Sequence, residues 1–119
     1  GGSIDHTMAN LQVIAYLSAN NMRGFLFDHG SVITAITNGR LCFEKIPSGY
    51  LSVFSSSTKA EGVTLSGLKY ELNNAVLTNT FPIGVSNEFV DQESSISVSD
   101  GTLFLVFPKE AKGKVKPLL

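Results

Sequence analysis

Short β-prone runs separated by turn residues fill the chain from Phe25 to Pro108, and they constrain its fold more than any other feature. Each run has the length of one strand, and Gly, Asn, Asp and Pro lie between the runs. Short strands at such spacing are typical of an antiparallel sandwich or barrel. We therefore predict a mainly β fold, an antiparallel β-sandwich or jelly-roll-like domain. Its expected strands are 25–27, 32–37, 41–46, 50–54, 63–72, 75–80, 85–90, 95–99 and 102–107.

Two turn signals inside this region are the most informative about strand connections. The Asn-Gly pair at 38–39 lies between two β-prone runs and predicts a hairpin, because both residues readily adopt positive φ. The Asn-Asn pair at 73–74 is expected to end the strand over 63–72. Alternation along that strand would place Tyr70 on one face, either in a core strand with a polar outer face or as the wall of a ligand site.

The residues before the β region carry a helical pattern. Apolar residues recur every three or four positions from Met8 to Leu17, which predicts a helix over 4–21 with one apolar stripe. Asp5 fits its N-cap or an acidic position in its first turn. The stripe has few local partners, so we expect this helix to be left over from an upstream α/β domain. The predicted organisation is 1–24 as the end of that domain, 25–108 as the β domain and 109–119 as a basic tail.

Composition and charge exclude several classes of protein. Hydrophobic residues make up 43% and charged residues 16%, the balance of an ordinary globular domain, and the formal net charge is −1. No basic face for nucleic acid is expected, and no apolar run approaches the ~18 residues of a membrane span. The tail is expected to be a solvated, frayed end. The single cysteine, Cys42, rules out an internal disulfide, and we expect it to be a buried small hydrophobe in a cytosolic protein.

The sequence offers no self-contained catalytic machinery. It has no glycine-rich phosphate loop, no Gly-x-Ser-x-Gly motif, no paired acids for magnesium and only two histidines. Two clusters remain, at 67–74 and 84–89. In the second, the side chains of Ser86 and Asn87 suit hydrogen bonds to a heterocycle. An equally good interpretation is a β-bulge or turn, where Ser and Asn are common.

Three stretches in order, 62–75, 84–89 and 95–99, resemble the C-terminal β domain of bacterial thiamine pyrophosphokinases. They read GVTLSGLKYELNNA, GVSNEF and SISVS. The opening stretch, GGSIDHTMANLQ, resembles that family's Gly-Gly-Arg-x-Asp-His motif and the helix that follows it. Ser3 stands where the family commonly has Arg, so the nucleotide-phosphate contact of that Arg does not carry over.

The resemblance implies the function of a larger enzyme. The family transfers a diphosphate group from ATP to thiamine with Mg²⁺, giving thiamine diphosphate and AMP. The resemblance places the ATP and Mg²⁺ sites in an N-terminal α/β domain, and the thiamine contacts and a homodimer interface in the β domain. The active site lies between domains of two subunits. This chain would then be the C-terminal portion of a cytoplasmic enzyme, inactive by itself.

The resemblance also assigns site residues. Tyr70 matches an aromatic position near thiamine, where its ring face would attract the thiazolium cation. Ser86 and Asn87 match a Ser-Asn pair that would bond the aminopyrimidine, and Gln12 is a weaker candidate. Asp5 and His6 match the Asp-His of the first motif, at the edge of the catalytic cleft, with a plain helix cap as the alternative for Asp5. The alternative for the chain as a whole is a non-catalytic β-sandwich module for binding or dimerisation.

Overall fold

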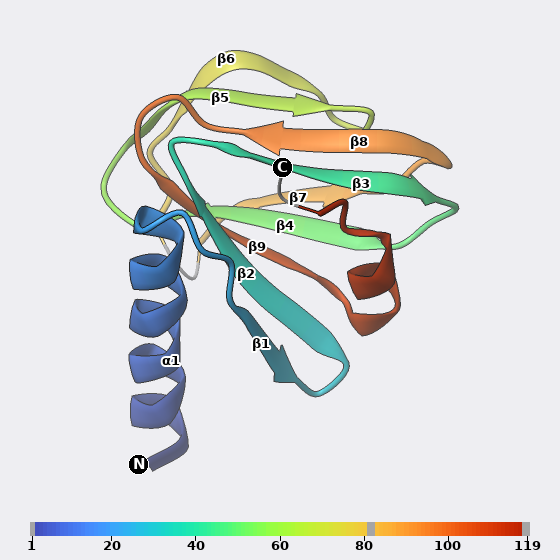
Figure 1. The fold of residues 1–119 in the computed structure, drawn as a ribbon. Helices are drawn as coiled ribbons and strands as arrows, with labels where there is room; N and C mark the ends of the chain where they lie inside the picture. The colour runs from blue at the N-terminus through green and yellow to red at the C-terminus, as the bar shows by residue number, and fades with distance from the viewer. Residues whose placement is uncertain (1, 81–82, 118–119) are drawn as a thin grey trace.

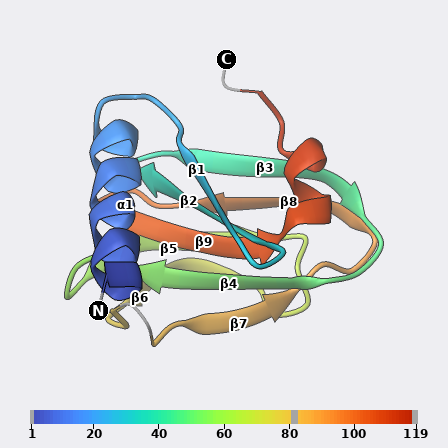
Figure 2. The same cartoon turned by 90° about the horizontal axis from the view of Figure 1, so that it is seen from below.

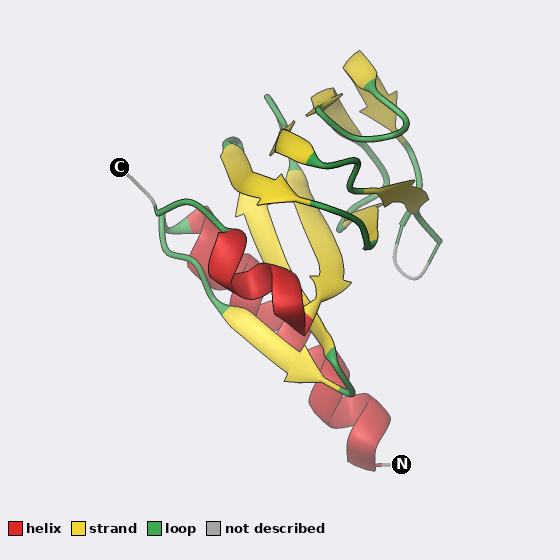
Figure 3. Ribbon diagram, turned by 90° about the vertical axis from the view of Figure 1, so that its right-hand side faces the viewer, coloured by secondary structure: helices red, strands yellow, loops and turns green. Residues whose placement is uncertain are grey.

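The computed structural model describes residues 2–80 and 83–117, with the backbone alone for residues 2–7. These residues form one α-helix, nine strands and a short C-terminal 3-10 helix (Figure 1). The elements are α1 (Gly2–Ala19), β1 (Phe25–Asp28), β2 (Ser31–Thr37), β3 (Arg40–Ile46), β4 (Tyr50–Ser55), β5 (Ala60–Ser66), β6 (Leu72–Leu77), β7 (Val85–Glu88), β8 (Gln92–Ser97), β9 (Thr102–Pro108) and η1 (Lys109–Lys114). Helices flank a body made of strands (Figure 3).

The strands form two antiparallel sheets that enclose the core. One sheet has the order β1-β2-β9-β4-β7 and the other has the order β3-β8-β5-β6. Alternate side chains point inward in strands such as β4, where Leu51 and Val53 are fully buried. The predicted antiparallel β-sandwich preceded by one helix is confirmed.

Three aromatic rings form the centre of this core. The Phe43 ring meets Phe89 and Phe107 edge-to-face, with centroids 5.0 and 5.1 Å apart. Phe43 lies on the smaller sheet and Phe107 on the larger one, so the cluster joins the two layers. Edge-to-face aromatic pairs add stability beyond the area they bury.

Helix α1 packs on the outer face of the larger sheet, against β1, β2 and β9 (Figure 2). Leu11 and Ile14 form a small buried cluster with Ala35 and Phe104. The expectation that the apolar stripe has few local partners is therefore wrong. The helix begins at Gly2 and not at residue 4, so Asp5 lies within it and does not cap it. No helix in the described part of the chain is long and apolar enough to cross a membrane.

The predicted hairpin at 38–39 is wrong, because β2 and β3 belong to different sheets. Asn38 adopts a positive φ of 46° as expected, and its backbone N–H donates to the carbonyl of Gly101. Its side-chain Oδ1 accepts from the N–H of Gly101 at 2.8 Å. The β2–β3 turn thus pairs with the β8–β9 turn, and the two connections cross together from one sheet to the other.

The predicted strand over 63–72 breaks at Gly67, and the Asn-Asn pair at 73–74 lies inside β6. Gly67 has φ +75°, and a Cβ there would lie 2.0 Å from the carbonyl oxygen of Glu93. Only glycine tolerates both the backbone conformation and the close approach. Tyr70 therefore lies in the β5–β6 connection and not in a strand.

Residues 109–117 pack against the β domain, so the expectation of a frayed end is wrong for them. Ala111 of η1 is buried in the core, and Lys112 Nζ lies 4.4 Å from the centroid of the Phe25 ring. The N–H of Lys116 donates to the carbonyl of Cys42 at 2.9 Å. Cys42 is half-buried and not fully buried as expected.

Replacing Ser94 by alanine is expected to leave the free energy of unfolding unchanged or to raise it by up to about 1 kcal/mol. Its Oγ is buried without a hydrogen-bond partner among the described residues, and such a hydroxyl costs stability. Thr34→Val is the matched control, because the buried Oγ1 of Thr34 donates to the carbonyl of Gly24 at 2.6 Å. Urea unfolding should show a loss for Thr34→Val alone, and an equal loss for Ser94→Ala would contradict this account.

Candidate functional site

The structure brings Tyr70 and Asn87 together, although they lie 17 positions apart in sequence. After Gly67 the chain turns toward β7, where Leu68 forms a bridge with Phe89 and the N–H of Lys69 donates to the carbonyl of Glu88. Asn87 is 3% exposed, and its side chain bonds the backbone of Tyr70 on both sides. Tyr70 is 55% exposed, so its ring is available to a ligand.

Charged groups gather beside the Tyr70 ring. Lys69 Nζ lies 3.2 Å from Glu88 Oε2 and 5.4 Å from the centroid of the Tyr70 ring. The hydrogen bond that Lys69 donates to the Glu88 carboxylate, and the negative charge of that carboxylate, raise the pKa of the Lys69 ammonium above its usual value. Lys69 is therefore a stable cation at neutral pH, and the ring already has a positive charge near it.

Ser86 and Asn87 point to opposite faces of β7. Ser86 is exposed and pairs with Ser52 of β4, whereas Asn87 is buried. The predicted Ser-Asn pair thus lies in one strand as expected, and its two side chains do not face the same way. Ser86 lies on the same face of β7 as Glu88, whose carboxylate forms the ion pair with Lys69.

Gln12 lies in a different part of the molecule from the β5–β6 connection that carries Tyr70, residues 67–71, here called the Tyr70 turn. It is exposed on α1 and lines a cavity of about 330 Å³ together with Leu11 and Phe104. Tyr70, Ser86 and Asn87 do not line this cavity. The predicted thiamine-binding residues of one chain therefore do not form a single enclosed site in this structure.

Asp5 and His6 are placed only by their backbone, in the first turns of α1. Their side chains lie outside the described residues, so their assignment to the catalytic cleft stays a prediction. Among the side chains that the structure describes, no group of three His, Cys, Asp or Glu residues could hold a metal ion.

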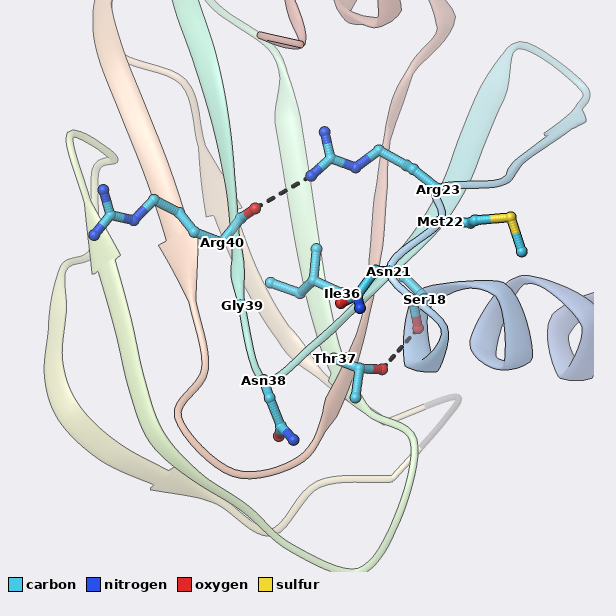
Figure 4. A pocket seen from close by; sticks show the side chains of 10 residues that line it. Ser18, Asn21, Met22, Arg23, Ile36, Thr37, Asn38, Gly39 and Arg40 are labelled. Carbon is cyan, nitrogen blue, oxygen red and sulfur yellow. Dashed lines mark hydrogen bonds between the residues drawn. The ribbon is translucent and has the colours of Figure 1, made fainter. Parts of the chain in front are cut away.

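A second cavity, of about 290 Å³, lies between the end of α1 and the β2–β3 turn (Figure 4). Ser18 Oγ and Thr37 Oγ1 form a hydrogen bond of 2.7 Å at its wall. The guanidinium groups of Arg23 and Arg40 point away from this pair (Figure 4). The Arg23 guanidinium donates to the carbonyl of Arg40 at 3.2 Å, and burial lowers the pKa of Arg23. Arg23 and Arg40 are the charged residues that line this cavity, and none of the predicted site residues lines it.

Comparison with protein families identifies the β domain. Residues 40–103, more than half of the chain, match the family described as "Thiamin pyrophosphokinase, vitamin B1 binding domain". The chain belongs to the thiamine pyrophosphokinase family. The matched range includes Tyr70, Ser86 and Asn87, and Gln12 lies outside it.

Individual thiamine pyrophosphokinases agree with the family match. The chain is 29% identical over 107 residues to the thiamine pyrophosphokinase of Bacillus subtilis, covering 89% of this chain and 50% of that protein. The crystal structure of the Bacillus subtilis enzyme superposes with a TM-score of 0.78 at 28% identity, covering 91% of this chain and 51% of that one. The chain therefore spans about half the length of this relative.

A more distant thiamine pyrophosphokinase shares the fold alone. The thiamin pyrophosphokinase of Candida albicans superposes with a TM-score of 0.70 at 15% identity, covering 92% of this chain and 42% of that one. The two-sheet arrangement is therefore retained in the thiamine pyrophosphokinase fold where little sequence identity remains.

Two features of the site were missed from sequence. One is the Lys69–Glu88 ion pair, because the residues from 63 to 72 are predicted to form one unbroken strand that does not turn toward Glu88. The other is the attachment of Asn87 to the Tyr70 backbone. The one available signal was Gly67, whose position within a β-prone run is typical of a break or close backbone approach.

Proposed function

We propose that this chain is the thiamine-recognising C-terminal part of a thiamine pyrophosphokinase, which transfers diphosphate from ATP to thiamine and releases thiamine diphosphate and AMP. The observation that carries the proposal is the match of residues 40–103 to the vitamin B1 binding domain. Within that range Tyr70, Ser86 and Glu88 lie exposed around one turn and one strand.

The chemistry of this surface supports a cationic ligand. The thiazolium ring of thiamine carries a permanent positive charge, and the face of an exposed aromatic ring attracts cations by ~0.5–2 kcal/mol. The Tyr70 ring already has the Lys69 ammonium near it, held by the Glu88 carboxylate. Thiazolium would therefore have to displace the Lys69 ammonium to reach the same ring face and carboxylate, while the hydroxyl of Ser86 suits the aminopyrimidine.

The remaining parts of the enzyme are proposed from the resemblance. ATP and Mg²⁺ would bind an N-terminal α/β domain, of which residues 1–24 are the last helix, with 25–108 as the thiamine-binding domain and 109–119 as a basic tail. Met8, Val13 and Tyr16 of α1 are exposed and would pack against that domain. The separation of Gln12 from the Tyr70 turn fits a site shared by two subunits of a cytoplasmic homodimer.

We expect residues 1–119 alone to bind thiamine weakly and to form no thiamine diphosphate from ATP. Binding is measured by following the backbone amide resonances of the chain during titration with thiamine, and activity by assaying thiamine diphosphate. Shifts that gather at Tyr70, Ser86 and Glu88 would support the proposed surface.

Formation of thiamine diphosphate by this chain alone would contradict the division of roles between domains. Absence of any thiamine-dependent shift would count against a thiamine-recognising role and would favour a non-catalytic dimerisation module. Choline, a cation without the aminopyrimidine, is the matched ligand control and should shift Ser86 less than thiamine does.

A further inference from the structure

The side-chain amide of Asn87 is committed to the backbone of its own chain. Its Oδ1 accepts from the N–H of Tyr70 at 3.0 Å and from the N–H of Glu88 at 2.9 Å. Its Nδ2 donates to the carbonyl of Tyr70 at 2.6 Å. A carbonyl oxygen has two lone pairs, so both acceptor positions of Oδ1 are filled. We call these three hydrogen bonds the Asn87 clamp.

The hydrogen-bond pattern fixes the orientation of this amide. If the amide were reversed, its NH₂ group would face two N–H donors and its oxygen would face the carbonyl of Tyr70. Only the observed orientation satisfies all three backbone groups. A side chain must therefore both accept and donate at this reach, which Asn does and an ionised Asp does not.

Burial and strand geometry keep Asn87 away from an external ligand. Asn87 is 3% exposed, and Val85 and Phe89 point toward the same core. Ser86 and Glu88 point to the opposite, exposed face of β7. A ligand that contacts Ser86 therefore approaches the face from which Asn87 is hidden.

The Tyr70 ring depends on its backbone for its position. More than half of the side chain is exposed, so packing does little to fix it. The clamp bonds both the N–H and the carbonyl of Tyr70, and the N–H of Lys69 adds a bond to the carbonyl of Glu88. Two consecutive residues of the β5–β6 connection are thus hydrogen-bonded to β7. Lys69 bonds its backbone, and Tyr70 bonds the side chain of Asn87.

We propose that Asn87 is a positioning residue that holds Tyr70 in place, and that it does not itself bond the aminopyrimidine of thiamine. The inference rests on the proposed function for the role of the Tyr70 ring. It corrects the assignment carried over from the family resemblance, which gave Asn87 a direct contact. Ser86 keeps the direct contact with the ligand.

The first test is amide hydrogen exchange in the 119-residue chain. Asn87→Ala should speed exchange of the Tyr70 and Glu88 amides by roughly tenfold or more while leaving amides of the β2–β9 ladder unchanged, because a buried hydrogen bond is lost only locally. Asn73→Ala is the matched control, since Asn73 is an exposed asparagine on β6. Unchanged Tyr70 exchange in Asn87→Ala would overturn the clamp.

A second variant, Asn87→Asp, tests the clamp with a side chain of the same size, in case Asn87→Ala fails to fold. Asn87→Asp keeps the size of the side chain and its acceptor oxygen but loses, when ionised, the donation to the Tyr70 carbonyl. It should protect the Tyr70 amide less than the natural chain at neutral pH and regain protection as pH falls and the carboxyl protonates. A protection factor of the Tyr70 amide that equals that of the natural chain and does not change with pH would contradict the need for a donor.

The third test separates positioning from direct contact by thiamine titration of Tyr70→Ala, Asn87→Ala and the double variant. If Asn87 acts through Tyr70, the double variant binds thiamine no more weakly than Tyr70→Ala does. Losses that add would show a direct contact and overturn the proposal. Failure of the natural chain to bind thiamine would count against the proposed function, whereas hydrogen exchange at Tyr70 would still decide the clamp.

Discussion

Replacing Phe43 by alanine is expected to lower the free energy of unfolding by about 3–5 kcal/mol, a large share of the ~5–15 kcal/mol typical of a domain. Phe43 is fully buried, and its ring meets Phe89 and Phe107 where the two sheets face each other. Its removal leaves a cavity bounded by both sheets, which cannot collapse without moving a ladder. Urea unfolding of the chain gives the value directly.

Phe27→Ala is the matched control for this prediction. Phe27 lies on β1 and is 60% exposed, so the change should alter the free energy of unfolding by less than about 0.5 kcal/mol. Similar losses for the two variants would mean that the Phe43 cluster does not hold the sheets together.

Replacing Tyr70 by alanine is expected to weaken thiamine binding about 2- to 30-fold, the equivalent of one cation–π contact. The exposed ring makes little contribution to the core, so the free energy of unfolding should stay nearly constant. Amide-shift titration with thiamine measures the affinity, and urea unfolding measures stability in the same samples.

Tyr70→Phe is the matched control, because it keeps the ring face and removes only the hydroxyl. It should bind thiamine as the natural chain does. Equal weakening by Tyr70→Phe and Tyr70→Ala would assign recognition to the hydroxyl, and unchanged affinity in Tyr70→Ala would reject a contact between the ring and thiamine.

The positions of most strands could be predicted from sequence because they depend on local patterns. The alternation of Leu51 and Val53 shows which face of β4 is buried without reference to any partner. Strand pairing depends on contacts between distant residues, such as Thr37 with Thr102. The Asn-Gly pair at 38–39 correctly predicted a tight turn, but local residues do not reveal that this turn joins two sheets.

The candidate site shows the same division. The resemblance marked Tyr70, Ser86 and Asn87, and the structure places the first and third side by side. The inward direction of Asn87 follows from the register of β7 on β4, which no local motif reveals. The ordered C-terminal segment escaped prediction since one small residue, Ala111, provides its buried anchor.

The position of β9 has a consequence for how the chain is made. The last strand of the described residues, β9, lies between β2 and β4, in the middle of the larger sheet. Until Thr102–Pro108 has left the ribosome, β2 and β4 each present an unpaired edge that can pair with another chain. Pairing of Ser31 with Pro108 closes a long loop that contains most of the other strands, so we expect this domain to fold slowly.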